Sequence, residues 1–179
     1  MSWRGEYDRH SLASRGIRTI TSLNKLDSPI VGLSHKDIVE EFDYRNYPVV
    51  VVDSWDFWAT WVHDEDIILF DADSYSKLSP LTIQFMLDHE IEEMSLSKGD
   101  NEWNDRWHSW YVKKYHKEAN KSIAHKYNPA DIELIKKDLY KLAISQNPDK
   151  SDDEIVDMVE WTTTGLDIYK DERIYEVAK

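Results

Sequence analysis

The stretch SPLTIQFMLDHEIEEMSLS, residues 79–97, carries the signals of a long helix, and the other predicted elements precede or follow it. Ser79 is a residue type that caps the free amides of a first helical turn, and Pro80 suits the first helical position. Lys98-Gly99, directly after the stretch, is typical of a helix end. The pattern therefore predicts one helix that runs from Ser79 to about Ser97.

Two short apolar runs precede this helix. Residues 48–52 read PVVVV and residues 67–70 read IILF. Runs of this length that are rich in β-branched residues predict buried strands. The aromatic segment from Trp55 to Trp61 joins the two runs, which suggests that they form a hairpin.

Further helices are predicted on both sides. Ser34-His35-Lys36-Asp37 resembles a helix start, with Ile38, Val39 and Phe42 on one face. Later helix signals define four more segments, the third opened by the capping-box pattern Ser151 to Glu154: they are residues 102–125, 128–145, a helix from 151 onward, and 166–177. The predicted fold is α+β and mainly helical, a small β element followed by a helical bundle.

Domain organisation follows from the same patterns. Residues 1–33 lack periodicity and predict an irregular N-terminal arm, and residues 34–179 predict one domain. No stretch reaches the roughly 20 apolar residues of a membrane span, and the first residues lack the apolar core of a secretory signal. We therefore expect a cytoplasmic protein with no membrane partner, and no pattern predicts its oligomeric state.

Charge and cysteine content narrow the functions. The chain has 179 residues, a formal charge of −13 and no cysteine. The negative charge makes a nucleic-acid partner unlikely because phosphates would be repelled. Without cysteine there are no disulfides or thiolate sites, so a metal would have to be held by His, Asp or Glu.

Three polar residues share one stripe of the helix at 79–97. At about 100° per residue, His89 and Glu93 lie one turn apart on the same face, and Glu90 lies at its edge. Apolar positions flank this stripe on both sides. A carboxylate-rich seam in a largely buried helix is costly unless a cation lies against it, and a divalent metal would be such a cation.

The motif His89-Glu90-x-x-Glu93 resembles the His-Glu-x-x-His helix of zincin metallopeptidases, with Glu93 in place of the second His. The resemblance implies that His89 and Glu93 bind a divalent metal, zinc in the family, and that Glu90 is the general base acting on the metal-bound water. A carboxylate ligand also favours harder metals such as Mn or Fe.

A third ligand is expected from the next helix. His108, Val112 and His116 share one face of it, but eight residues, about 12 Å of helix, separate the two histidines, so one metal can use only one of them. We predict His108, since a short connection would bring the start of the second helix back to the first. His116 remains the alternative. Both could instead be ordinary histidines hydrogen-bonded to Asp88 or Glu92.

A second resemblance concerns the kind of genome in which similar proteins are found. The spacing of residues from His89 to His108 is similar to a pattern in small proteins of bacteriophages and mobile elements, and those proteins resemble minimal zincins. In this chain the pattern consists of His89, Glu90, Glu93, Gly99, Trp103 and His108. The opening residues 3–17 resemble N-termini of phage and archaeal-virus proteins. This implies a bacterial or archaeal host cytoplasm.

The first functional hypothesis is therefore a metal-dependent hydrolase of zincin type, a peptidase acting on a peptide or protein. The alternative is a non-enzymatic acidic protein that docks or inhibits a basic partner, with the Trp-rich stretch 103–115 as its contact surface. A third option is a platform on which aromatic and basic residues bind single-stranded nucleic acid, but the negative net charge counts against it. The residues of this platform would be Trp103, Arg106, Trp107, Trp110, Lys113 and Lys114. Asp71-Ala72-Asp73 predicts a polar turn rather than a second metal site.

Overall fold

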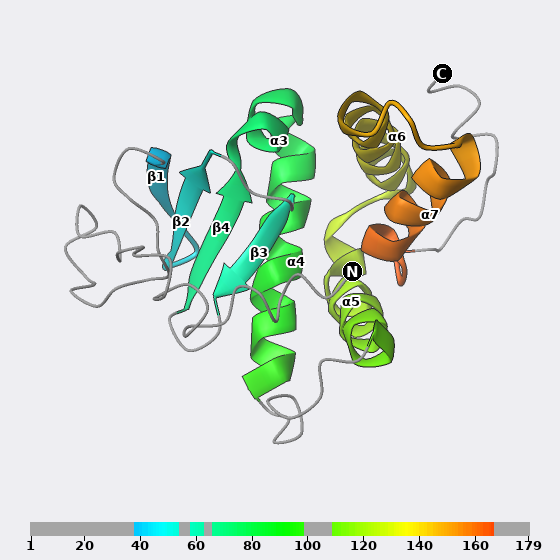
Figure 1. Cartoon of the computed structure of the whole chain (residues 1–179). Coiled ribbons are helices and arrows are strands. Elements are labelled where there is room, and N and C mark those ends of the chain that lie inside the picture. The colour runs from blue at the N-terminus through cyan, green and yellow to red at the C-terminus, as the bar shows by residue number, and fades with distance from the viewer. Residues whose placement is uncertain (1–37, 54–57, 63–65, 99–108, 167–179) are drawn as a thin grey trace. The chain divides into compact units, whose positions relative to one another are not determined.

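The structure, a computed structural model, describes residues 38–53, 58–62, 66–98 and 109–166 (Figure 1). These residues form two compact units, one containing the β-sheet and the other containing the helices from α4 onward. The predicted class is confirmed, since a four-stranded sheet precedes a mainly helical remainder. The expected arm 1–33 lies outside the described residues, and the single domain at 34–179 stays a prediction.

The sheet has the strand order β1-β2-β4-β3. The two predicted strands are both present, as β2 (Tyr47–Val52) and β4 (Ile67–Asp71) at the centre. The edges are β1 (Ile38–Tyr44) and β3 (Ala59–Val62). Val49 to Val52 and Ile67 to Phe70 are at most 1% exposed, as expected for central strands whose two faces are both covered.

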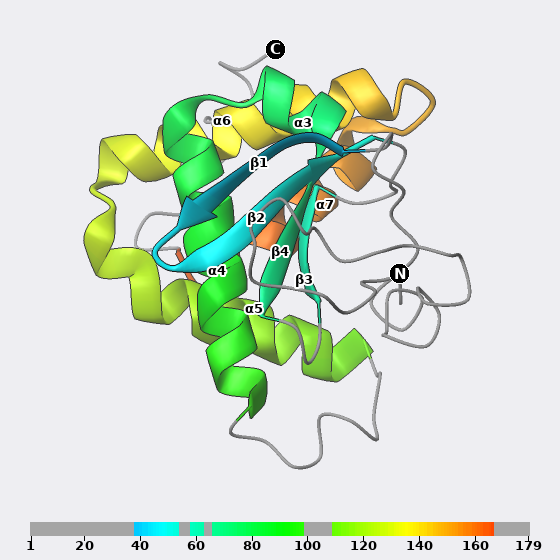
Figure 2. The same cartoon turned by 90° about the vertical axis from the view of Figure 1, so that its left-hand side faces the viewer.

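The predicted hairpin between β2 and β4 is wrong, because these strands are parallel, with Val49 opposite Ile68. Two other pairs are antiparallel, β1 with β2 and β3 with β4 (Figure 2). The intervening segment contributes β3 at the outer edge, so β2 and β4 run in the same direction. A parallel pair needs a crossover, and an aromatic segment alone does not reveal one.

The predicted helix from Ser34 is also wrong in its described part, where residues 38–44 form strand β1. The reason lies in the turn that follows. Arg45 and Asn46 both have positive φ, 50° and 68°, which is the backbone of a two-residue type I′ hairpin turn. This turn places Tyr44 opposite Tyr47 and pairs β1 with the valine run, and that pairing outweighs the local helix signal.

Helix α3 (Ala72–Lys77) begins where a polar turn was predicted. Oδ2 of Asp71 accepts hydrogen bonds from the backbone N and the Oγ of Ser74, at 2.9 and 2.7 Å, so this carboxylate caps the helix. Tyr75 packs against Phe42 and Phe70 of the sheet, with ring centroids 5.9 and 5.6 Å apart. The acidic run is therefore a helix start on the sheet unit.

The helical unit begins with α4 (Pro80–Lys98), which confirms the helix predicted at residues 79–97. Ser79 caps it by accepting from the backbone N of Thr82 at 3.3 Å. The next helix is α5 (Ser109–Ile123), followed by the 3-10 turn η3 (Ala124–Lys126). The predicted start at 102 lies outside the described residues, and so does most of the aromatic face from Trp103 to Tyr111.

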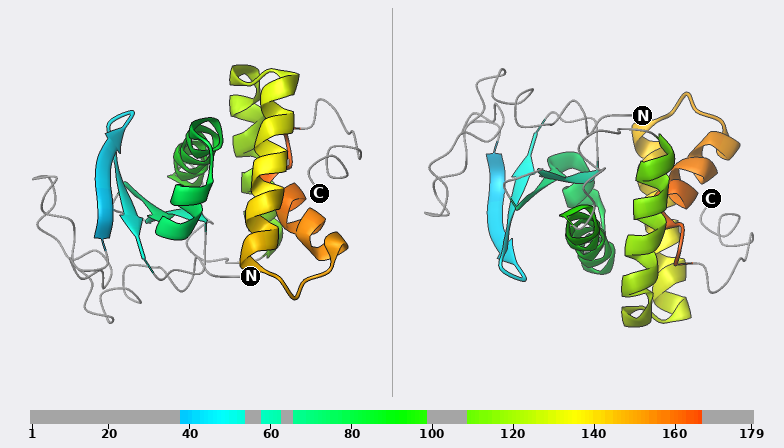
Figure 3. Two further views of the ribbon diagram at one scale, coloured as in Figure 1. Left: turned by 90° about the horizontal axis from the view of Figure 1, so that it is seen from above. Right: turned by 90° about the horizontal axis from the view of Figure 1, so that it is seen from below.

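The last two described helices, α6 (Pro129–Gln146) and α7 (Asp152–Thr163), agree with prediction. Each opens with a full capping box, Asn128 with Asp131 in α6 and Ser151 with Glu154 in α7. Helix α6 packs against α4 and α7, and Figure 3 shows α6 and α7 side by side. The predicted helix 166–177 lies outside the described residues except for Leu166.

No helix in the described segments is long and apolar enough to cross a membrane.

Candidate metal centre

The polar seam of α4 lies at its middle. His89, Glu90 and Glu93 are 1%, 2% and 0% exposed, although all three carry polar or ionisable groups. The helix is buried around most of its circumference at this level, with Phe85, Leu87 and other apolar residues on either side. Burial of two carboxyl groups and an imidazole is costly unless their charges are compensated within the seam.

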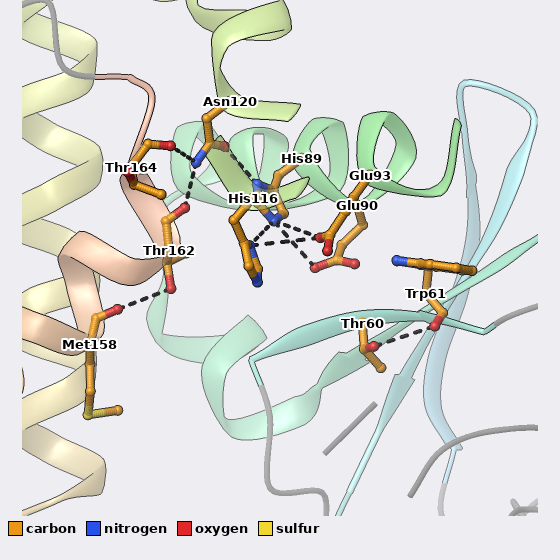
Figure 4. A network of polar contacts seen from close by, with 10 residues as sticks. All are labelled: Thr60, Trp61, His89, Glu90, Glu93, His116, Asn120, Met158, Thr162 and Thr164. Atoms are coloured by element: carbon orange, nitrogen blue, oxygen red, sulfur yellow. Dashed lines mark hydrogen bonds and ion pairs between the residues drawn. The ribbon is translucent and has the colours of Figure 1, made fainter. Parts of the chain in front are cut away.

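Helix α5 supplies the other side of the site. His116 and Asn120 are one turn apart on α5, and both are at least 95% buried. His89 contacts Asn120, while Glu93, one turn later on α4, lies opposite His116, one turn earlier on α5 (Figure 4). The two helices are therefore antiparallel here, as expected for a chain that turns back after α4.

Three potential ligand atoms converge between the helices. Nε2 of His89 lies 3.1 Å from Oε2 of Glu93 and 2.7 Å from Nδ1 of His116. The third distance, between Nδ1 of His116 and Oε2 of Glu93, is 3.8 Å. Ligand atoms from these three side chains all lie within 4.8 Å of one another, so the group is close enough to hold one metal ion.

The size of this triangle fits a tetrahedral ion. Zinc bonds to nitrogen and oxygen are about 2.0–2.1 Å, so two ligands of one zinc stand roughly 3.3 Å apart. The three distances between the ligand atoms bracket that spacing. A point in their plane lies about 1.9 Å from all three atoms, so an ion slightly above the plane would reach normal bond lengths. Two imidazoles and a carboxylate are also common zinc ligands.

Electrostatics of the seam centre on His89. Burial alone lowers the pKa of an imidazole, but the hydrogen bond and the charge of Glu93 act in the opposite direction, with the charge of Glu90 adding to them. The net result is a pKa of His89 above its ordinary value. The seam therefore attracts positive charge at the atom that faces Glu93, whether a proton or a metal supplies it.

Glu90 lies beside this group without joining it. Its Oε1 is 4.0 Å from Nε2 of His89, longer than the spacing of two ligands on one zinc. The carboxylate is therefore close to the ligand triangle, although Glu90 is not one of the three residues whose ligand atoms converge.

The neighbouring acid, Asp88, faces another partner. Its Oδ2 accepts a hydrogen bond of 2.9 Å from the hydroxyl of Tyr127 and lies 3.6 Å from Nζ of Lys126. Asp88 therefore has a hydrogen-bond donor and a cation close to it.

The structure describes most of the predicted site residues, but not all of them. His89, Glu93 and Glu90 lie together on α4 as expected, and His116, the alternative third ligand, completes the group. His108, the preferred third ligand, lies outside the described residues, so its role stays a prediction. Asn120 was not predicted. The available signal was its spacing of four residues from His116, which places both side chains on one helical face.

Comparisons of the chain with protein families, with curated proteins and with solved structures found no match.

Proposed function

We propose that the protein is a metal-dependent hydrolase of zincin type, in which His89, Glu93 and His116 bind one divalent metal, zinc in the simplest case. The convergence of three ligand atoms within 2.7–3.8 Å supports this proposal. At most one proton can lie between any two of these atoms, whereas one metal ion satisfies all three. The negative charge of Glu93 then also has a buried counter-charge.

Three protein ligands are the number that catalytic zinc sites use, because a fourth position then stays open for water. A metal held by the three ligands would lower the pKa of water bound to it toward ~7, which is the chemistry that hydrolysis of a carbonyl compound needs. Glu90 is the proposed acceptor of the proton, and the position of its carboxylate next to the triangle supports this role. Its 2% exposure keeps bulk water from competing for that proton.

A peptide or protein is the proposed substrate class, following the resemblance to zincin metallopeptidases. The motif differs from theirs at Glu93. A carboxylate in place of the second imidazole lowers the charge of the metal centre by one, so the site would favour harder metals more than an all-histidine site does.

Burial of the group supports a second candidate, a structural metal that joins α4 to α5. His89, Glu93, Glu90 and His116 are all at least 95% buried, and a structural metal does not have to be reached by a substrate. The two candidates share these three ligands. They differ in the fourth position, which is open to water only in the hydrolase, and in Glu90, which acts as a base only in the hydrolase.

The first experiment measures metal content. Protein purified without chelator is analysed by elemental analysis, and its zinc affinity is measured by competition with a chromophoric chelator. We expect about one metal per chain in the wild type and loss of metal in His89→Ala, Glu93→Gln and His116→Ala. Glu92→Gln, a change of the adjacent carboxylate on the same helix, is the matched control and should keep its metal. A wild type that binds no metal ends the proposal.

The second experiment compares Glu90→Gln with the wild type on a library of fluorogenic peptides. A general base contributes roughly 10²–10⁴-fold to rate, so the variant should retain its metal and lose at least 100-fold in activity. Equal activity of the two proteins, or a metal-loaded wild type that cleaves nothing, would favour the structural centre instead.

A further inference from the structure

The side-chain amide of Asn120 has a fixed orientation. Its Nδ2 donates to the carbonyl oxygens of Thr162 and Thr164, at 2.8 and 2.7 Å, where α7 ends (Figure 4). Carbonyl oxygens can only accept, so the NH₂ group must face them. Oδ1 therefore faces α4, where it lies 2.7 Å from Nδ1 of His89.

This orientation determines the tautomer of His89. Because Oδ1 of Asn120 is an acceptor, Nδ1 of His89 must carry the hydrogen. A neutral imidazole has only one such hydrogen, so Nε2 keeps its lone pair. Nε2 is the atom that faces Glu93 and His116, at 3.1 and 2.7 Å. The amide thus presents the correct nitrogen to the ligand triangle.

The turn after α7 is built to reach Asn120. Gly165 has φ +96°, and a Cβ at this position would lie 2.3 Å from the carbonyl oxygen of Lys117 on α5. No residue with a side chain fits such a close approach without movement of the backbone. Glycine here lets the turn lie directly on α5, which brings the carbonyls of Thr162 and Thr164 to Asn120, one turn beyond Lys117.

We propose that Asn120 is the positioning residue of the centre, which holds His89 with Nε2 free to bind metal and links the metal site to the turn at the end of α7. The link to metal rests on the proposed function, whereas the tautomer is also a property of the metal-free protein. Hydrogen bonds to the second nitrogen of a ligating histidine commonly change metal affinity 10–100-fold. Coupling is reciprocal, so metal binding must stabilise the turn as much as the turn strengthens binding.

The tautomer is tested first, without metal. Nitrogen-15 chemical shifts of His89 are recorded with chelator present, at an alkaline pH where the imidazole is neutral. We expect the hydrogen on Nδ1 in the wild type and in Asn120→Asp, which keeps an acceptor, and a mixture of tautomers in Asn120→Leu. Asn147→Leu is the matched control, because Asn147 also donates to a backbone carbonyl, that of Ala143, but at the end of α6. A wild-type His89 with its hydrogen on Nε2 overturns the proposal.

Metal affinity is tested next. Asn120→Leu should bind zinc roughly 10–100-fold more weakly than the wild type, and Asn147→Leu should not. Gly165→Ala should also weaken binding, although it replaces no ligand, because it displaces the turn that holds Asn120. Unchanged affinity in both Asn120→Leu and Gly165→Ala refutes the link. If the wild type binds no metal, the proposed function fails, while the nitrogen shifts still decide the role of Asn120.

Amide hydrogen exchange tests the reciprocal effect in the wild type alone, so no variant has to fold. The amides of Thr164 and Leu166 donate to carbonyls within the turn region, those of Glu160 and Thr163. Their exchange should slow by at least tenfold when zinc is added. The amide of Asn147, which donates to Ala143 at the end of α6, is the internal control and should not change. Equal effects of zinc at both helix ends would overturn a specific link.

Discussion

Nδ1 of His116 lies 2.7 Å from Nε2 of His89, which is a hydrogen-bond distance and shorter than the roughly 3.3 Å between two ligands of one tetrahedral zinc. In the metal-free protein one hydrogen can join the two rings. Metal binding has to replace that hydrogen and separate the two nitrogens by about 0.6 Å. Proton and metal therefore compete for the same small volume.

This competition predicts opposite pH dependences. The pKa of His89 is raised in the folded protein, so in the presence of chelator its contribution to stability is complete below the unfolded pKa of about 6.5 and is lost as pH rises through the folded value. With zinc the sign reverses, because deprotonation favours the metal. Urea unfolding with chelator and with zinc across this pH range measures both slopes. His89→Gln should remove the difference between the two slopes, and equal slopes in the wild type would place the metal elsewhere.

The identity of the third ligand is tested by three histidine substitutions. His116→Ala should lose metal, because Nδ1 of His116 is one of the three converging atoms. His125→Ala changes an exposed histidine just beyond α5 and should have no effect. His108→Ala is the decisive variant, since the sequence favoured His108. Retention of metal in His108→Ala together with loss in His116→Ala assigns the ligand, and the reverse result restores the sequence prediction.

Local signals were enough to predict most helices of the second unit. The cap residues Ser79, Asn128 and Ser151 each sit at a helix start, and their hydrogen bonds involve residues only three positions away. Strand pairing was not predictable in the same way. The parallel pairing of β2 with β4 joins residues about 20 positions apart, and the helix-like pattern at 38–42 gave way to pairing with the valine run.

The residues of the candidate site also differ in whether local signals were enough to predict them. His89 and Glu93 were predictable because both belong to one helix, where spacing defines the face. The choice between His108 and His116 depends on the position of α5 along the axis of α4, and helical periodicity does not determine that position. Asn120 needed knowledge of the turn after α7, 42 and 44 residues away along the chain.

The capping box of α7 predicts a measurable loss of stability. Ser151→Ala removes the hydroxyl that accepts from the backbone N of Glu154, and such a cap contributes about 1 kcal/mol to the free energy of unfolding. Ser145→Ala, which removes a hydroxyl bonded to a carbonyl inside α6, is the control and should change stability by less than about 0.5 kcal/mol. Urea unfolding measures both, and equal effects would mean that the box does not stabilise α7.

The same box has a pH dependence. Hydrogen bonds from the backbone N and the hydroxyl of Ser151 lower the pKa of Glu154, so its contribution is present above the ordinary glutamate pKa and disappears as pH falls through the lowered value. The difference in stability between the wild type and Glu154→Gln should therefore shrink in acid. A difference that stays constant with pH would contradict a charged partner in the cap.

Tyr127→Phe tests the buried carboxylate next to the metal group. The hydroxyl of Tyr127 donates to Oδ2 of Asp88, and Asp88 is 1% exposed. Removal of this hydroxyl therefore deprives a desolvated carboxylate of a hydrogen-bond donor. Loss of such a bond costs about 1–3 kcal/mol in the free energy of unfolding. Tyr75→Phe is the control, because its hydroxyl contacts exposed Glu40 at 3.5 Å, and it should cost less than about 0.5 kcal/mol. Zinc affinity should change little in either variant, since Asp88 is not among the three converging ligands. A loss of metal in Tyr127→Phe comparable with that in His116→Ala would show instead that Asp88 and its donor belong to the metal site.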